Sequence, residues 1–206
     1  MERHIIITLG RRIGAGGLEI AHTLAKRLDI KVYDKELIEI AARESGLAPD
    51  VFEKRDEVPA SKSRFARFFG LRSSNYADQG YAQDNAISEE GLFKTQSDII
   101  RQLADNGSGI FVGRCADYVL RDRPGMLSVF ITADKEDRIA RIVEKKGFTE
   151  KEAEKYIDHG ERRRTSYYNY YTFKEWGDSA SYDLCLNSSR FGIEGCVDFI
   201  IKALGK

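Results

Sequence analysis

Short apolar runs alternate with amphipathic segments along most of the chain. Five runs rich in β-branched or aromatic residues predict strands. They lie near residues 4–9, 31–33, 109–113, 127–131 and 182–186. Between these runs, apolar residues recur at helical spacing, as Ile20, Leu24 and Leu28 do. Strands that alternate with helices predict a parallel sheet with helices on both faces, which is a three-layer α/β/α domain.

A glycine-rich turn joins the first predicted strand to the first helix. Its glycines are Gly10, Gly14, Gly16 and Gly17. Such a turn lets backbone N–H groups converge at a helix N-terminus, where they bind an anion such as a nucleotide phosphate. The consensus G-x-x-x-x-G-K-[ST] is only partly met, because Gly17 stands at the lysine position and Leu18 at the hydroxyl position. Arg11 occupies the first glycine position. A turn that merely connects strand to helix has the same pattern, so this stretch alone leaves both interpretations open.

Charged residues follow two of the predicted strands. The carboxyl ends of strands in an open α/β sheet are where ligands bind. Asp34 comes directly after the strand at 31–33, and either caps a helix or contacts a substrate or metal. Arg114 ends the strand at 109–113, with Asp117 one turn further on. A guanidinium at this place suits a bidentate phosphate contact, and a structural salt bridge is the alternative.

Arginines also recur on two neighbouring predicted helices. Arg138 and Arg141 lie three residues apart and share a helix face. The second helix opens with a capping box, Thr149-x-x-Glu152, and later contains Glu161-Arg162-Arg163-Arg164. Arginines so placed could form a lid, over about residues 138–175, that neutralises a transferring phosphoryl group. A solvated charged face would have the same sequence pattern. The tyrosines that follow, over residues 167–171, are interpreted as packing.

Residues 60–86 interrupt the alternating pattern. This stretch combines the basic residues Lys62, Arg64, Arg67 and Arg72 with the aromatic residues Phe65, Phe68, Phe69 and Tyr76. Three interpretations fit it. It is a mobile basic cap that closes over a phosphorylated substrate, an amphipathic helix that packs its phenylalanines on the core, or a patch for single-stranded nucleic acid, which is the least favoured of the three.

Composition narrows the class of protein. The 206 residues suit one domain with a sizeable core. Lys+Arg and Asp+Glu are both 33, so no global field attracts nucleic acid, and no run is long enough to span a bilayer. Cys115, Cys185 and Cys196 have no metal-ligand spacing and are expected to be buried free thiols. With no apparent signal peptide, we expect a cytoplasmic protein. No pattern fixes its oligomeric state.

These motifs, in this order, resemble the cytidylate kinase-like family of P-loop proteins. The matching stretches are GAGGLEI at 14–20, Tyr33-Asp34, Val112-Gly113-Arg114-Cys115-Ala116-Asp117, Thr132-Ala133-Asp134 with Arg138 and Arg141, Glu161-x-x-Arg164, and Trp176-Gly177-Asp178 through Tyr182-Asp183-Leu184. The resemblance covers nearly the whole chain. It implies a P-loop NTPase fold with a five-stranded parallel sheet, a helical insertion at about 35–95 that binds a nucleoside monophosphate, and the lid.

The resemblance also implies ligands and residue roles. It implies ATP and Mg²⁺ as cofactors, and phosphoryl transfer to a nucleoside monophosphate, CMP or dCMP first. The ATP phosphates would contact Gly14, Ala15, Gly16, Gly17, Leu18 and the arginines Arg11, Arg12, Arg138 and Arg141. The acceptor would contact Asp34, Arg114, Asp117, Glu161 and Arg164, with Arg114, Arg162 and Arg164 acting in catalysis. Asp34 or Asp117 could hold the metal through water.

Three positions depart from the family pattern. The loop lysine is absent, Ile157-Asp158 stands where the kinases have Arg-Asp, and Val112 replaces an acidic residue before Gly113-Arg114. Arg11, Arg12, Arg138 and Arg162 are the candidates for the missing cation. Two other hypotheses therefore stay open. One is a nucleotide-binding regulator that has lost phosphoryl transfer, and the other is a kinase of a different small-molecule acceptor.

Overall fold

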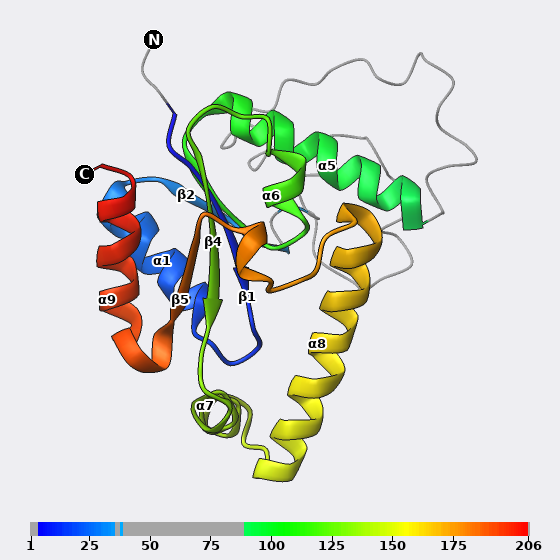
Figure 1. Cartoon of the computed structure of the whole chain (residues 1–206), viewed down its shortest axis with the longest axis vertical. Coiled ribbons are helices and arrows are strands. Elements are labelled where there is room, and N and C mark those ends of the chain that lie inside the picture. Colours follow the sequence, from blue (N-terminus) through cyan, green and yellow to red (C-terminus); the bar gives the residue numbers. More distant parts are fainter. Residues whose placement is uncertain (1–3, 36–37, 39–88, 206) are drawn as a thin grey trace, which may run out of the picture.

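A single parallel sheet organises the computed structural model, which describes residues 4–35, 38 and 89–205. The sheet has five strands in the order β2-β3-β1-β4-β5. Their bounds are β1 Ile6–Arg11, β2 Lys31–Tyr33, β3 Gly109–Val112, β4 Met126–Thr132 and β5 Leu184–Asn187. Every paired strand is parallel, with Leu9 opposite Val112 on one side of β1 and opposite Val129 on the other. All strands therefore end at one edge (Figure 1).

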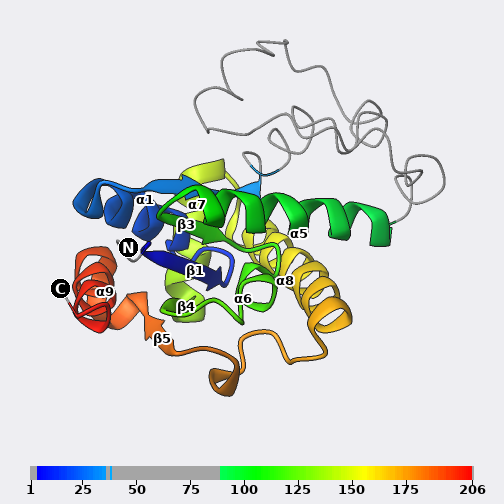
Figure 2. The ribbon, with the colours of Figure 1, turned by 90° about the horizontal axis from the view of Figure 1, so that it is seen from above.

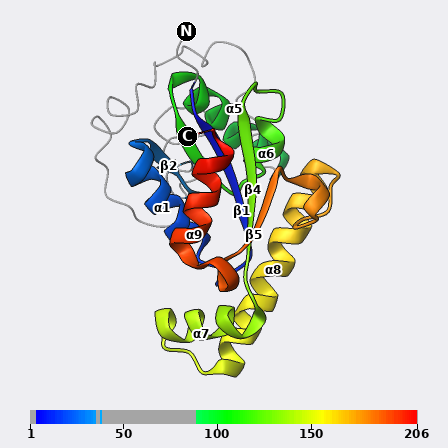
Figure 3. The same cartoon turned by 60° about the vertical axis from the view of Figure 1, so that its left-hand side comes forward.

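Helices cover both faces of this sheet. They are α1 Gly17–Leu28, α5 Glu89–Asn106, α6 Ala116–Val119, α7 Lys135–Lys146, α8 Glu150–Thr172 and α9 Ser188–Ala203. Seen along the sheet, α1 and α9 lie on one face, and α5 and α6 lie on the other (Figure 2). The predicted three-layer α/β/α fold is confirmed. Helix α7 lies beyond the carboxyl ends of the strands, and α8 returns from it along the α5 side (Figures 1 and 3).

The packing of the core explains why the strands are continuous apolar runs in the sequence. Successive side chains of a strand point to opposite faces, and here both faces are covered. Ile7 and Leu9 pack into the cluster beneath α1 and α9. Ile6 and Phe111 pack into the second cluster, beneath α5 and α6. Because each strand is anchored on both sides, its carboxyl end is held as a fixed platform.

Three details differ from the sequence predictions. Strand β5 begins at Leu184 and not near residue 182. Asp183 is instead bound to Ser128, whose amide donates to the Asp183 carboxylate over 2.8 Å. Strand β5 also runs one residue further than predicted, to Asn187, and α9 follows at once from Ser188, with the Asn187 side chain accepting from the Ser189 amide. Cys115 and Cys196 are buried as expected, but Cys185 is exposed, so that prediction was wrong for one thiol. It lies on β5, an edge strand of the sheet.

Other predictions meet the structure in part. The capping box at Thr149 and Glu152 is present in full at the start of α8. Residues 60–86, and the predicted insertion up to residue 88 apart from Lys35 and Ile38, lie outside the described residues. Within the described part of the chain, no helix has the length and apolar character needed to cross a membrane.

Candidate functional site

The glycine-rich turn lies between β1 and α1, at the edge where the strands end. Gly14 and Gly16 have φ angles of +80° and +72°, a conformation that favours glycine. A Cβ atom on Gly14 would lie 2.6 Å from the carbonyl oxygen of Arg138, so α7 approaches the turn closely. Gly16 caps α1 in this conformation. Glycine is therefore required at these positions both for the backbone conformation and because there is no room for a side chain.

Side chains from α7 and α9 hold the carbonyl groups of this turn. Arg141 donates to the Gly14 carbonyl over 3.0 Å, and Ser188 donates to the Ala15 carbonyl over 2.9 Å. In a trans peptide the N–H points away from the preceding C=O, so the Gly16 amide faces away from Ser188. The first amides of α1 also lack acceptors within the helix. The turn thus presents N–H groups and the positive end of a helix to an anion.

Glu161 ties the turn to both helices of the α7–α8 hairpin. Its carboxylate accepts from Arg138 over 2.6 Å and from Arg12 over 2.9 Å. The Ile13 amide donates to the same carboxylate over 3.3 Å. The side chains of Glu161 and Arg138 are 15% and 11% exposed. Glu161 was expected to contact the acceptor, and the structure places it on the phosphate-binding turn, where it engages two of the four candidate cations.

Three arginines gather on the other side of the turn, where β1 and β3 end. Arg164 donates to the Arg11 carbonyl over 2.7 Å, which brings α8 to the end of β1. The Arg114 guanidinium lies 5.6 Å from the ring centre of Tyr167, also on α8. Burial, and after it the charges of Arg164 and Arg114, lower the pKa of Arg11 to about 9, with Asp34 acting in the opposite direction. The pKa of Arg164 is lowered by burial as well. Among the described residues, the charges that act on Arg11 are therefore mainly positive.

These arginines line a cleft of about 1060 Å³ between the sheet edge and α8. Asp117 lies in it and accepts a hydrogen bond from the Tyr168 hydroxyl over 2.6 Å. Burial raises the pKa of Asp117. Aromatic rings line the same cleft, and Phe93 stacks on Tyr171 with 3.9 Å between ring centres. The tyrosines that the sequence suggested only for packing thus also form a wall of the cleft.

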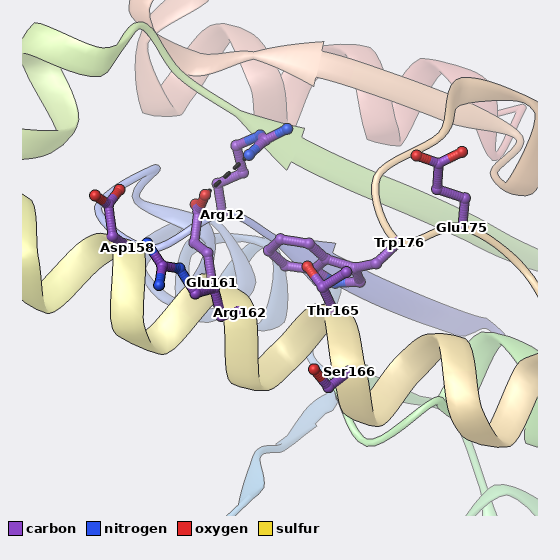
Figure 4. A pocket seen from close by; sticks show the side chains of 8 residues that line it. All are labelled: Arg12, Asp158, Glu161, Arg162, Thr165, Ser166, Glu175 and Trp176. Atoms are coloured by element: carbon purple, nitrogen blue, oxygen red, sulfur yellow. Dashed lines mark hydrogen bonds and ion pairs between the residues drawn. The ribbon is translucent and has the colours of Figure 1, made fainter.

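A second hollow, of about 490 Å³, adjoins the first and shares Arg162, Ser166 and Trp176 with it. Figure 4 shows the side chains that line it. Glu161 of α8 reaches toward Arg12 across it, and Thr165 and Trp176 also line it. The Arg12 guanidinium lies 5.8 Å from the centre of the Trp176 ring. Sequence reasoning missed Trp176 as a site residue, although a tryptophan beside Gly177-Asp178 in a matching stretch was an available signal.

The predicted site residues therefore fall into three groups. Arg11, Arg114, Arg162, Arg164 and Asp117 share the large cleft. Arg12, Arg138, Arg141 and Glu161 hold the turn or each other. Leu18 is 44% exposed on the first turn of α1. The described residues contain no group of three His, Cys, Asp or Glu side chains that could hold a metal ion. Mg²⁺ needs only one or two carboxylates beside phosphate oxygens and water, and Asp34 and Asp117 are residues of that type.

Known proteins resemble this chain in sequence and in structure. A cytidylate kinase of Archaeoglobus fulgidus is 26% identical over 202 residues, which are 96% of this chain and 93% of that protein. The crystal structure of an uncharacterized protein from Eubacterium ventriosum has a TM-score of 0.74 at 28% identity, and covers 98% of this chain and 99% of its own. A shikimate kinase from Bacteroides thetaiotaomicron shares the fold, with a TM-score of 0.55 at 14% identity and the same coverage.

The match extends to the glycine turn, the Gly113-Arg114 strand end and the α7–α8 hairpin together. The model of the cytidylate kinase-like family matches residues 6–190, which include all of these parts. The chain therefore belongs to the cytidylate kinase-like family.

Proposed function

We propose that this protein transfers the γ-phosphoryl group of ATP to a nucleoside monophosphate, with CMP and dCMP the first candidates. The observation that carries the proposal is the cluster of Arg11, Arg114 and Arg164 beside the amides of the glycine turn. Phosphoryl transfer depends on positioning and on neutralising charge on the phosphate oxygens, and needs no covalent catalyst. The cluster supplies charge at the place where two phosphate groups would meet.

Each part of the site has a role in this reaction. The amides of the turn and of the first turn of α1 would bind the ATP phosphates. Arg114, at the end of β3, would bind the acceptor phosphate, and Arg164 would bring charge from α8 as part of a lid formed by α7 and α8. Asp34 and Asp117 would hold Mg²⁺ through water, and bound Mg²⁺ supplies neutralisation of charge on the transferring group.

The acceptor base would lie on the aromatic wall of the cleft. Tyr167 and Tyr171 have ring centres 4.8 Å apart, and Phe93 stacks on Tyr171. Flat rings of this kind offer a stacking surface to a pyrimidine. The wall lies on the same side of α8 as Arg114, whose guanidinium lies over the Tyr167 ring. A monophosphate could thus place its phosphate on Arg114 and its base on the rings.

The test is ADP formation from ATP and Mg²⁺ with CMP, dCMP, UMP, AMP, GMP or no acceptor. We expect stimulation by a pyrimidine monophosphate. Arg114→Ala and Arg164→Ala should each lower kcat/KM at least about a hundredfold, because each removes a charged contact to phosphate. Lys155→Ala, an exposed position on the same helix as Arg164, is the matched control and should retain activity. Full turnover in both arginine variants would contradict the assignment.

One observation favours a second candidate, a nucleotide-binding regulator without transferase activity. Gly17 and Leu18 stand where a kinase has the lysine and the hydroxyl that binds Mg²⁺. The same panel separates the two. If no acceptor stimulates ADP formation while ATP raises the melting temperature, the chain either regulates through ATP binding or uses an acceptor outside the panel.

A further inference from the structure

The two departures at the ends of the phosphate-binding turn touch each other. Arg11 stands where the consensus has its first glycine, and Gly17 stands where it has lysine. A Cβ atom on Gly17 would lie 2.6 Å from the Arg11 Cβ and 2.8 Å from its Cγ. The alkyl stem of Arg11 therefore fills the space in which a side chain at position 17 would begin. Compared with the consensus, the long side chain is thus at position 11 and the glycine is at position 17, and these two positions are in contact.

Past Gly17, the Arg11 side chain runs toward the end of β3. A Cβ atom on Gly113 would lie 2.2 Å from Arg11 Nη1, so the absence of a side chain at 113 makes room for the guanidinium. Arg11 lines the large cleft together with Arg114 and Arg164. Among the described residues, its guanidinium donates no hydrogen bond and forms no ion pair. It is thus a half-buried cation whose guanidinium lies beside Gly113, the residue that precedes Arg114.

The other candidate cations are differently placed. Arg12 and Arg138 are bound to Glu161. Arg141, a further arginine near the turn, donates to the Gly14 carbonyl. Arg162 is exposed on α8. Only Arg11 among these five combines a position beside Gly17 with a guanidinium that the described residues leave without a hydrogen-bond acceptor.

We propose that Arg11 replaces the missing loop lysine as the cation that binds the transferred phosphate, and that Gly17 and Gly113 are the positions whose lack of a side chain admits it. This inference rests on the proposed function in one respect, that the bound phosphate is transferred to an acceptor. Its core, that Arg11 binds ATP phosphates in place of a lysine at 17, holds for a nucleotide-binding regulator too.

The first experiment measures the binding of ATP and of inorganic tripolyphosphate by calorimetry, without acceptor. Arg11→Gly should weaken both at least about tenfold, since one charged phosphate contact is lost. The reciprocal exchange R11G/G17K restores the consensus pair and should regain most of the affinity. Arg27→Ala, which removes a surface arginine paired with Asp198, is the control and should bind like the wild type. Wild-type affinity in R11G, or a double variant that binds no better than R11G, would overturn the proposal.

A second measurement tests the steric part and does not depend on any ligand. Gly17→Ala should lower the melting temperature of the wild type, because its Cβ collides with the Arg11 stem, and should be tolerated in R11G. Equal losses in both backgrounds would refute the shared space. The two proposals also fail differently. A silent acceptor panel with the tenfold effect on ATP binding contradicts transfer to the tested nucleoside monophosphates alone, whereas turnover that survives R11G contradicts the role of Arg11 alone.

Discussion

Arg11 is a single residue that works against the stability of the fold. Burial, Arg164 and Arg114 all lower its pKa, to about 9, so its charged form is less favourable in the folded chain than in the unfolded one. At neutral pH it is nevertheless charged. We expect Arg11→Met, which keeps the alkyl stem against Gly17, to raise the melting temperature by roughly 2–4 °C, the shift that about 1 kcal/mol produces in a chain of this size. This figure is small because water in the cleft screens the charges.

The same residue predicts a dependence on pH. The folded pKa lies below the unfolded value, so above about pH 9 the unfolded state holds a proton that the folded state has lost. The unfavourable contribution of Arg11 is present below pH 9 and disappears as pH rises toward the unfolded pKa. The difference in melting temperature between wild type and Arg11→Met should therefore be smaller at pH 10 than at pH 7. A gap that stays constant would show that the stem, and not the charge, sets the difference.

Helix α8 is the element that joins the phosphate-binding turn to α7, through Glu161. Glu161→Gln leaves Arg12 and Arg138 without their carboxylate, and we expect it to destabilise the protein by about 2 kcal/mol, less than for a fully buried pair because Arg12 is 37% exposed. Glu154→Gln is a matched control on the same helix. It breaks an ion pair with Lys135 of α7 whose members are 43% and 55% exposed, so water screens the pair and its loss should leave stability almost unchanged. Urea unfolding of both variants measures the difference. Equal losses would mean that Glu161 contributes no more than a surface pair.

The elements themselves follow from local sequence, and their contacts do not. Alternation of apolar runs and helical spacing predicted the strands and the parallel sheet, and Thr149-x-x-Glu152 predicted the start of α8. The glycine turn was predicted together with its departures from the consensus. The sequence alone did not distinguish which of four arginines replaces the missing cation. The contact between Arg11 and Gly17 depends on the direction that the Arg11 side chain takes in the folded protein, which no sequence pattern indicates. The sequence also could not place Glu161 on the turn, since that contact spans 148 residues of sequence.

At the scale of the whole molecule, the strand ends form a fixed platform and the α7–α8 hairpin stands over it. The sheet is packed on both faces, whereas α8 meets the rest of the molecule on one side only, through the polar contacts of Glu161 and Arg164, the cluster that Ile157 shares with Ile13, and the stacking of Tyr171 on Phe93. An element that is packed on one side opens at lower free energy than a sheet that is packed on both. Charge brought to the cleft by ATP would bind the same arginines. Nucleotide binding should therefore draw α8 toward the sheet edge.

Trp176 can report that movement, because it is the single tryptophan of the chain and lies in the hollow that α8 borders. The ring is partly exposed and lines this hollow together with Thr165 and Arg162 of α8 (Figure 4). If α8 closes, water leaves the indole, and its emission should shift to shorter wavelength on addition of ATP. Glu161→Gln, which removes the ion pairs between α8 and Arg12 and Arg138, should reduce the shift at saturating ATP. An unchanged emission spectrum under conditions where calorimetry shows ATP bound would contradict closure, since the hollow could not then have narrowed around Trp176.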